Sequence, residues 1–515
     1  MAPQIPVLTS AHNTDAGGSL RDIFLTNRDA PCLIDAASGK TFTYGDVSGL
    51  ACGLAGLLAR EGVKPGQAVA ACAENGVECV VFFLACLAGG YLAAPLHPAL
   101  AQDDARYILD TLSPGLVLAS PGVPALPPGP WVRRDLDACV REAAAAPAPW
   151  PLAAPRDTEL FTLHFTSGST GRPKGVFHRV GSLLGAARAY NAHMGIGPQH
   201  RHYHVMPMSY MAGLLNGLLS PLMAGGSVVL GRAFDARSAL NFWKAPLRHG
   251  VTTMWLAPTM IASLLRLDRD AAGTAYCREH VPFVSVGTAP LPPADAKAFE
   301  ERYGTRVCPS YGLSETLFVS ATPPAAQAPD GACGTVLAGV EMGARPAAAD
   351  ADAGDAQELL VRTAYLMAGY LDPATGLPDA LDPETWFPTG DIGVTDAAGW
   401  IRVTDRIKDL IIRGGVNIAP RAVERVLAGH PAVADAAVLG LPDAFYGETV
   451  AAALILRPGF VPETVFPELT ALCRERLAPA SVPARFFALE EFPVSVTGKV
   501  LKRRLKDRLT GVGAP

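Results

Sequence analysis

The stretch FTSGSTGRPKGV, Phe165 to Val176, places three glycines among serines, threonines and one lysine, directly after the strand-like run LFTLHF. Glycines let the backbone approach an anion closely, and N–H groups, hydroxyls and a lysine supply donors and charge. A flexible Gly/Ser linker is the alternative, but a strand before the loop and an expected helix at Ser182 to Tyr190 after it disfavour a linker. Lys174 is followed by Gly175 and not by Ser or Thr, so this is not a Walker motif. The stretch predicts a phosphate-binding loop of another kind.

Bulk composition narrows the class of protein. A chain of 515 residues is too long for one hydrophobic core and predicts two or more domains. The formal net charge of -5 gives no reason to expect nucleic acid. Ten cysteines without C-x-x-C spacing favour reduced thiols in a cytoplasm over disulfides or zinc. Residues 1–22 lack a basic start followed by an apolar run, so we expect no signal peptide.

Two uncharged runs, Cys79 to Leu96 and Val205 to Leu230, raise the question of a membrane span. Both are interrupted by glycine and proline, so we expect buried helices and strands and no membrane span. From Leu20 to Pro114, helical and strand-like segments alternate, which predicts layered α/β structure. Between about 323 and 400, Gly, Pro and Asp separate short strands, which predicts a small β-rich subdomain.

Three histidines, His200, His202 and His204, lie at strand period on one face. A metal cluster is one interpretation of this spacing. Because no carboxylate or cysteine nearby completes a ligand set, ordinary strand histidines are favoured.

Further motifs follow the glycine loop in a fixed order. They are GTAPLP (Gly287 to Pro292), SYGLSET (Ser310 to Thr316), WFPTGDIG (Trp386 to Gly393), DRIKDLIIRGGVNIAP (Asp405 to Pro420) and PVSVTGKVLKRRL (Pro493 to Leu505). Each alone is a weak signal. Together with TSGSTGRPKG they closely resemble the adenylate-forming superfamily of acyl-CoA synthetases, peptide-synthetase adenylation domains and luciferases, with acyl-CoA synthetases the nearest type. The resemblance runs from about Thr41 to Leu505.

The resemblance implies a domain plan and a chemistry. We expect a large N-terminal domain of layered α/β sheets, residues 1–405, and a small mobile α+β C-terminal domain, residues 406–515. In this superfamily a carboxylate attacks the α-phosphorus of ATP and expels pyrophosphate, and a thiol then displaces AMP from the acyl-adenylate. Because the first step brings two anions together, fixed positive charge and phosphate donors must act in the transition state. The implied cofactors are ATP, Mg²⁺ and coenzyme A, or the phosphopantetheine of a carrier protein arriving in trans.

The resemblance also assigns nucleotide-binding roles. The loop residues that hold the β- and γ-phosphates are Thr166, Ser167, Gly168, Ser169, Thr170, Gly171 and Lys174. In SYGLSET, Tyr311 stacks on adenine, Ser314 donates to the α-phosphate and Glu315 holds Mg²⁺. Ser310 and Gly312 complete that nucleotide-binding motif. The family more often has Thr where Ser314 stands, a change that keeps the hydroxyl.

Two other motifs complete the implied nucleotide site. The small residues that line adenine and the acyl pocket are Gly287, Thr288 and Ala289. Asp391 and Arg406 bind the ribose hydroxyls, because a carboxylate accepts two hydrogen bonds from a diol. Outside the family context, Asp391 would be a turn residue and Arg406 a surface charge.

The resemblance also assigns roles to residues in or next to the mobile C-terminal domain. Lys499 matches the lysine that reaches the carboxylate and α-phosphate during adenylation. Lys408 occupies the hinge about which the small domain turns between half-reactions. Gly414 and Gly415 line the thiol channel in the turned form. The basic run after Lys499 meets phosphates of CoA or an acidic carrier, or is a solvated helix face.

The acyl pocket is expected to include Tyr210, Met211, Gly213 and Gly287. Many acyl-CoA synthetases have histidine where Tyr210 stands. Amino-acid-activating members have aspartate where Met211 stands, and an unpaired ammonium in an apolar pocket would be unfavourable. We therefore expect a fatty or aromatic acid with a neutral tail, and not an α-amino acid.

The lead hypothesis is an AMP-forming acid–thiol ligase that makes acyl-CoA in the cytoplasm. The alternatives are a stand-alone adenylating enzyme that loads a carrier protein, and a non-catalytic nucleotide-binding regulatory module. Intact Glu315 and Lys499 argue against the last. The sequence leaves open the identity and chain length of the acid, the pathway and the oligomeric state, with a homodimer as one option.

Overall fold

The computed structural model describes residues 16–150, 155–167, 172–235, 237–347, 357–382, 384–494 and 500–511. Five predicted site residues lie outside the described residues: Gly168, Ser169, Thr170, Gly171 and Lys499. The chain forms two compact units, Met1–Glu341 with Arg362–Thr385, and Met342–Val361 with Trp386–Pro515. The domain boundary after residue 405 stays a prediction.

The first unit contains a mostly parallel sheet. In sheet order its strands are β15 (Thr335–Val336), β14 (Leu317–Ala321), β13 (Arg306–Leu313), β12 (Phe283–Val286), β11 (Thr253–Leu256), β9 (Arg201–His204), β10 (Ser227–Leu230), β1 (Pro31–Asp35) and β2 (Thr41–Thr43). The strands from β13 to β1 pair in parallel, and β2, β14 and β15 pair antiparallel at the edges. The central strands β10, β11 and β12 are short, apolar and wholly buried, as parallel strands covered on both faces should be.

A second sheet of the first unit carries the glycine loop. In sheet order its strands are β19 (Pro378–Ala380), β18 (Gly369–Leu371), β8 (Pro173–Arg179), β7 (Leu160–Ser167), β4 (Leu92–Leu96), β3 (Ala68–Cys72), β5 (Leu116–Ala119) and β6 (Arg133–Asp135). The strands from β6 to β7 are parallel, and β7, β8, β18 and β19 are antiparallel. The glycine loop therefore connects two antiparallel strands, β7 and β8.

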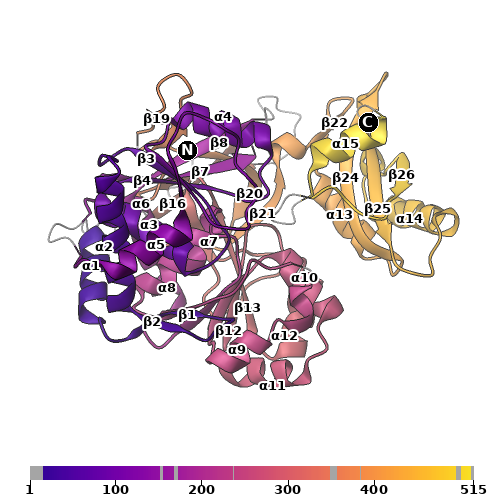
Figure 1. Ribbon diagram of the computed structural model, residues 1–515. Coiled ribbons are helices and arrows are strands. Elements are labelled where there is room, and N and C mark those ends of the chain that lie inside the picture. The colour runs from indigo at the N-terminus through magenta and orange to yellow at the C-terminus, as the bar shows by residue number, and fades with distance from the viewer. Residues whose placement is uncertain are drawn as a thin grey trace. The chain divides into compact units, whose positions relative to one another are not determined.

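Helices cover these sheets (Figure 1). They are α1 (Ala16–Thr26), α2 (Tyr44–Arg60), α3 (Val77–Gly89), α4 (Gln102–Leu112), α5 (Leu136–Ala145), α6 (Val180–Met194), α7 (Met211–Leu214), the π-helix η1 (Leu215–Leu219), α8 (Ser220–Met223), the 3₁₀-helix η2 (Ser238–Asn241), α9 (Lys244–His249), α10 (Pro258–Leu267), α11 (Ala271–His280) and α12 (Pro293–Tyr303). Helix α3 is apolar on all sides and buried, and it ends at Gly90 with φ of 68°. The prediction of a buried helix, turn and strand for Cys79 to Leu96 is confirmed.

Within the ranges that the structure describes, no helix has the length and apolar character needed to cross a bilayer. The run from Val205 to Leu230 contains α7, η1 and α8 followed by β10, as its glycines and proline predict.

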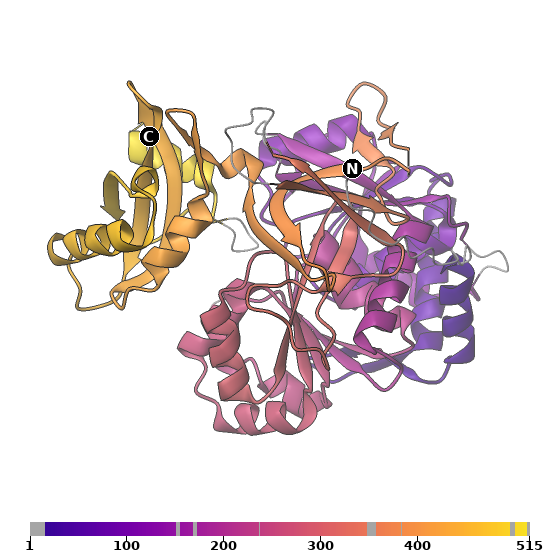
Figure 2. The same cartoon turned by 180° about the vertical axis from the view of Figure 1, so that it is seen from behind.

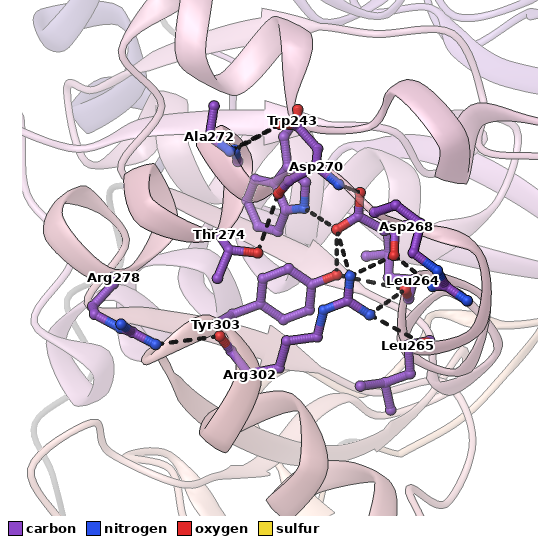
Figure 3. Close-up of polar contacts among 12 residues, drawn as sticks. Trp243, Leu264, Leu265, Asp268, Asp270, Ala272, Thr274, Arg278, Arg302 and Tyr303 are labelled. Atoms are coloured by element: carbon purple, nitrogen blue, oxygen red, sulfur yellow. Dashed lines mark hydrogen bonds and ion pairs between the residues drawn. The ribbon is translucent and has the colours of Figure 1, made fainter.

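The buried carboxylate of Asp268, which follows α10, contacts residues of α12 and Trp243, which precedes α9 (Figure 3). Its side chain accepts hydrogen bonds from the Tyr303 hydroxyl at 2.6 Å and from Trp243 Nε1 at 3.2 Å. The Arg302 guanidinium pairs with the same carboxylate at 3.3 Å. This cluster fixes the segment after α10 against α12 and supplies the partners that a buried charge requires.

A third sheet lies largely in the second unit. Its strands are β16 (Val340–Pro346), β17 (Gln357–Thr363), β20 (Phe387–Thr395) and β21 (Ile401–Arg406). The expected β-rich segment from about 323 to 400 is thus rich in strands, but they enter three different sheets, because β15, β18 and β19 pair within the first unit.

The last sheet forms the core of the C-terminal part. Its strands are β23 (Val416–Ile418), β22 (Ile411–Arg413), β25 (Gly447–Leu456), β24 (Val433–Asp443) and β26 (Arg485–Ala488), and its helices are α13 (Pro420–Ala428), α14 (Pro462–Arg476), α15 (Lys502–Thr510) and the 3₁₀-helices η3 (Ile407–Asp409) and η4 (Pro479–Ser481). Alternate residues of β25 face opposite sides. Val450 and Ala452 pack with residues of α13 and α14, whereas Ala451 packs with Leu505 of α15. Helices therefore cover both faces of the hairpin (Figures 1 and 2).

Buried histidines predict that acid destabilises the protein. Burial lowers the pKa of His164, His202 and His204 from 6.5 to about 3. Since the unfolded chain protonates these side chains near pH 6.5, the unfolded state binds more protons below that pH. We expect the free energy of unfolding to be highest above pH 6.5 and to fall steadily below it.

Urea denaturation over a pH series measures this loss. His204→Gln should reduce the dependence of the free energy of unfolding on pH, because one proton fewer is taken up on unfolding. An identical pH dependence in this variant and the unaltered protein would contradict a lowered pKa of His204 in the folded state.

Candidate active site

The glycine loop joins β7 and β8, and their pairing sorts their side chains. Thr166 lies opposite Lys174, and Thr162 lies opposite His178. Residues directly opposite share one face of a sheet, and residues two apart on a strand share it too. Thr162, Thr166, Lys174 and His178 therefore lie on one face, while Phe177 lies on the other in an apolar cluster.

The next strand, β18, adds a residue to this polar face. Tyr370 pairs with Val176, which lies between Lys174 and His178 on β8. The Lys174 Nζ lies 3.2 Å from the centre of the Tyr370 ring, a cation–π contact. The Tyr370 hydroxyl donates a hydrogen bond to Glu315 Oε1 at 2.9 Å. Burial and the neighbouring Glu315 carboxylate raise the pKa of Tyr370, so its hydroxyl keeps its proton.

The motif SYGLSET forms the end of β13 and the turn into β14. The His178 Nε2 donates to the Ser314 carbonyl at 2.6 Å, and the Met367 N–H donates to the Glu315 carbonyl at 2.8 Å. Burial lowers the pKa of His178 to about 4, so the ring is neutral with its proton on Nε2. Three contacts from β8 and the β18 segment thus fix the turn that carries Ser314 and Glu315.

Gly312 enables this turn. A Cβ there would lie 2.0 Å from the Leu317 carbonyl oxygen, so no other residue fits without a backbone shift. Tyr311 lies opposite Ser320 in the same ladder and is half-buried. Its role beside adenine stays a prediction.

The segment Gly287 to Ala289 follows β12 directly. Val286 pairs with Pro309, so Gly287 lies beside Ser310 at the carboxyl ends of parallel strands, where such sheets bind ligands. A Cβ on Gly287 would lie 2.7 Å from the Trp255 ring and 2.8 Å from Ser310 Oγ. Thr288 has φ of 73°, a strained value for a β-branched residue and a type of strain found at functional sites.

The predicted acyl-pocket wall begins at helix α7. Tyr210 precedes the helix, and its ring lies 5.1 Å from that of His97. Met211 is buried, and a Cβ on Gly213 would lie 2.0 Å from the Pro207 carbonyl. Burial raises the pKa of Tyr210 to about 12 and lowers that of His97, so both rings are neutral at pH 7. No lysine or arginine occurs in residues 208–223.

Asp391 and Arg406 contact each other within the second unit. They lie opposite each other on β20 and β21, and Arg406 Nε donates to Asp391 Oδ1 at 2.6 Å. Asp391 is buried, so the arginine balances a charge that would otherwise be unfavourable there. The predicted pair is therefore adjacent, and its role at ribose stays a prediction.

The predicted hinge and channel residues lie close together in the sequence. Lys408 is exposed in η3. Gly414 and Gly415 form the two-residue turn between β22 and β23, with φ of 57° and 84°. Positive φ at both central positions is the requirement of a type I′ hairpin turn. The Gly414 N–H donates to the Tyr446 carbonyl at 2.8 Å, which fixes the hairpin to a neighbouring loop.

The residues that flank Lys499 are paired. Val494 and Val500 form a β-bridge, and the Leu501 N–H donates to the Pro493 carbonyl at 2.7 Å. In the following helix α15, Lys502 and Lys506 pair with Glu424 and Glu448 at 2.8 and 3.0 Å. These two lysines of the basic run therefore have structural partners, whereas Arg503 and Arg504 are exposed.

The first unit thus brings Lys174 and Glu315 together at Tyr370, with Ser314 next to Glu315 in the same turn. Tyr370 and His178 were not predicted as site residues. The period-2 alternation in PKGVFHR could have placed His178 on the face of Lys174. No local pattern would have found Tyr370, because its contact with Glu315 joins residues 55 positions apart.

Two sequence profiles show the class of protein to which this fold and site belong. The sequence profile described as "AMP-binding enzyme" matches residues 22–371, and that of the "AMP-binding enzyme C-terminal domain" matches residues 422–499. The chain belongs to the AMP-binding enzyme family.

Particular relatives are similar along nearly the whole chain. The sulfoacetate–CoA ligase of Cupriavidus necator is 30% identical and is aligned over 93% of this chain and 94% of its own length. The 2-succinylbenzoate–CoA ligase of Bacillus subtilis is 31% identical over 92% of this chain and 94% of its own. The structure of the o-succinylbenzoate CoA synthetase of Bacillus subtilis with its acyl-adenylate intermediate has a TM-score of 0.78 at 27% identity, covering 95% of this chain and 98% of that one.

The adenylate-forming family, the α/β fold with large and small domains, and an AMP-forming acid–thiol ligase are confirmed. Family membership implies ATP and coenzyme A as cosubstrates.

Proposed function

We propose that this enzyme activates a fatty or aromatic carboxylic acid with a neutral tail and transfers the acyl group to coenzyme A. One observation supports this most strongly. Lys174 of the glycine-loop hairpin lies over the ring of Tyr370, whose hydroxyl donates to the Glu315 carboxylate, and His178 bonds the backbone carbonyl of the neighbouring Ser314. This is the donor and acceptor set that a reacting nucleoside triphosphate requires.

We assign roles from this arrangement and the family resemblance. Lys174, with Thr166 and the loop that follows, holds the β- and γ-phosphates, and Ser314 donates to the α-phosphate. Tyr311 and the segment Gly287 to Ala289 contact adenine. Asp391 and Arg406 bind ribose.

Mg²⁺ fits the Glu315 carboxylate. Glu315 is half-buried, and one of its oxygens accepts from Tyr370. Among the described residues, nowhere do three or more His, Cys, Asp or Glu side chains lie close enough together to form a metal site. A single carboxylate suits Mg²⁺, which takes its other ligands from substrate phosphates and water. When bound, the ion would neutralise charge on the phosphates that leave.

The reaction then runs in two steps. The substrate carboxylate attacks the α-phosphorus, pyrophosphate leaves with its charge balanced by Lys174, and Lys499 neutralises oxygens shared between the carboxylate and the α-phosphate. The C-terminal domain next turns about Lys408. The thiol reaches the acyl-adenylate past Gly414 and Gly415, attacks the acyl carbon and releases AMP.

The predicted pocket wall bears on the charge that the tail of the acid can carry. Residues 208–223 offer no cation, and Tyr210 and His97 are neutral. A second anionic group would therefore lack a partner on this wall. The second candidate is an acid with such a group, because relatives are named for sulfoacetate and 2-succinylbenzoate.

A pyrophosphate-release screen over fatty, aryl, dicarboxylic, sulfonated and L-amino acids, with and without CoA, tests the proposal. We expect release with fatty or aryl acids and acyl-CoA formation when CoA is present. Release with only doubly anionic acids would establish the second candidate. Strong exchange with an L-amino acid, and none with simple acids, would overturn both.

The acceptor needs a separate arm of the screen. Adenylation without transfer to CoA would favour a carrier-protein thiol. Failure of every acid would favour a nucleotide-binding regulatory module. A homodimer and a cytoplasmic location stay predictions.

A further inference from the structure

Tyr370 lies between two opposite charges. The Lys174 ammonium lies over its ring at 3.2 Å, and the Glu315 carboxylate accepts from its hydroxyl at 2.9 Å. Within the described part of the chain, neither Lys174 nor Glu315 has an ion pair with another residue or with each other. One aromatic side chain therefore contacts the cation with its face and the anion with its edge.

The strand register determines the face on which Tyr370 lies. Tyr370 lies opposite Val176, so it shares the polar face with Lys174 and His178. The neighbouring Met367 N–H bonds the Glu315 carbonyl, which ties the same segment to the backbone of the turn. Tyr370 is thus held beside β8, the strand of Lys174, by backbone pairing, and its side chain bonds the turn that carries Glu315.

We propose that Tyr370 is a positioning residue that keeps Lys174 and Glu315 apart, so that the cation stays available to phosphate and the carboxylate to Mg²⁺. The proposal rests on the roles proposed above for those two residues. A lysine and a glutamate at one partly buried site attract each other, and a direct pair would occupy the groups that ATP and Mg²⁺ need. The ring is a weaker partner for the ammonium than a carboxylate, so phosphate can displace it.

Two variants separate the two contacts. Tyr370→Phe keeps the ring beneath Lys174 and removes the hydrogen bond to Glu315. Tyr370→Leu removes both contacts and permits the direct ion pair. Tyr365→Phe is the matched control, because its hydroxyl donates to the Ala338 carbonyl at 2.9 Å and contacts neither charge.

Calorimetric binding of α,β-methylene-ATP over a Mg²⁺ series provides a readout other than activity. For Tyr370→Phe we expect the Mg²⁺ concentration for half-maximal binding to rise about tenfold, the lower end of the effect of losing an outer-shell partner. We expect nucleotide affinity at saturating Mg²⁺ to stay near that of the parent protein. Tyr370→Leu should also weaken nucleotide binding at saturating Mg²⁺.

The outcomes distinguish this inference from the proposed function. An unchanged Mg²⁺ requirement in Tyr370→Phe, or an equal shift in Tyr365→Phe, would overturn the positioning role. Nucleotide affinity at saturating Mg²⁺ that is equal in Tyr370→Leu and Tyr370→Phe would overturn the spacer role of the ring. The proposed function is tested by acid-dependent pyrophosphate release from the unaltered enzyme. Its absence would remove that function while the binding series still tests Tyr370.

Discussion

Replacing Lys499 with alanine is expected to lower the rate of adenylation steeply and to spare transfer of a supplied acyl-adenylate to CoA. The adenylation transition state joins two anionic groups, and loss of one preorganised donor at such a centre lowers the rate about 10²–10³-fold. Thiol attack on an existing acyl-adenylate does not need that charge in the same place. Pyrophosphate exchange measures the first half-reaction, and acyl-CoA formation from synthetic acyl-adenylate measures the second.

Lys297→Ala is a matched control for loss of a lysine. Lys297 is exposed on α12, where it pairs with Glu301 at 3.8 Å. We expect both half-reactions to keep their rates in this variant, because an exposed pair contributes little. Equal loss of both half-reactions in Lys499→Ala would contradict the proposed turn of the C-terminal domain about Lys408.

Replacing Asp268 with alanine is expected to lower the free energy of unfolding by about 3–5 kcal/mol, the range for breaking a buried ion pair. The change would leave the Tyr303 hydroxyl, the Trp243 N–H and the Arg302 guanidinium without their shared acceptor (Figure 3). Asp268 is fully buried, so water cannot replace these bonds without a rearrangement of the cluster. Urea denaturation measures the loss.

Asp270→Ala provides the comparison within the same segment. Asp270 caps α11 by accepting from the Ala272 and Gly273 N–H groups at 3.0 and 3.2 Å. Loss of a helix cap costs about 1 kcal/mol. Asp268→Asn should have an intermediate effect, because an amide oxygen still accepts but no longer carries charge. Equal losses for Asp268→Ala and Asp270→Ala would contradict the importance of the buried pair.

Many of the proposed site residues could be predicted from short sequence motifs. The TSGSTGRPKG and SYGLSET stretches predicted Lys174, Ser314 and Glu315 as site residues, and in the structure Lys174 and Glu315 contact the same tyrosine while Ser314 lies beside Glu315. The motifs also include Gly287 and Gly312, and in the structure a Cβ at either position would lie too close to other atoms. Such requirements are local, so they remain visible in a linear sequence.

Other features depend on pairing between distant segments. The distribution of the strands in residues 323–400 among three sheets follows from edge pairing, which strand patterns alone do not specify. The cluster around Asp268 was also not predicted from the sequence. A lone aspartate after a helix looks like a turn residue until Tyr303 and Trp243 are folded against it.

The sequence by itself determined the family, the adenylation chemistry and the residue types that carry it, because phosphate binding needs particular groups at short spacings. Only the tertiary structure decided how those groups are held apart and oriented. His178 reaches Ser314 across 136 positions, and Tyr370 reaches Glu315 across 55. These hydrogen bonds depend on the register of β18 on β8 and on the packing of one sheet against the next. Neither the register nor the packing is encoded in any single stretch of the chain.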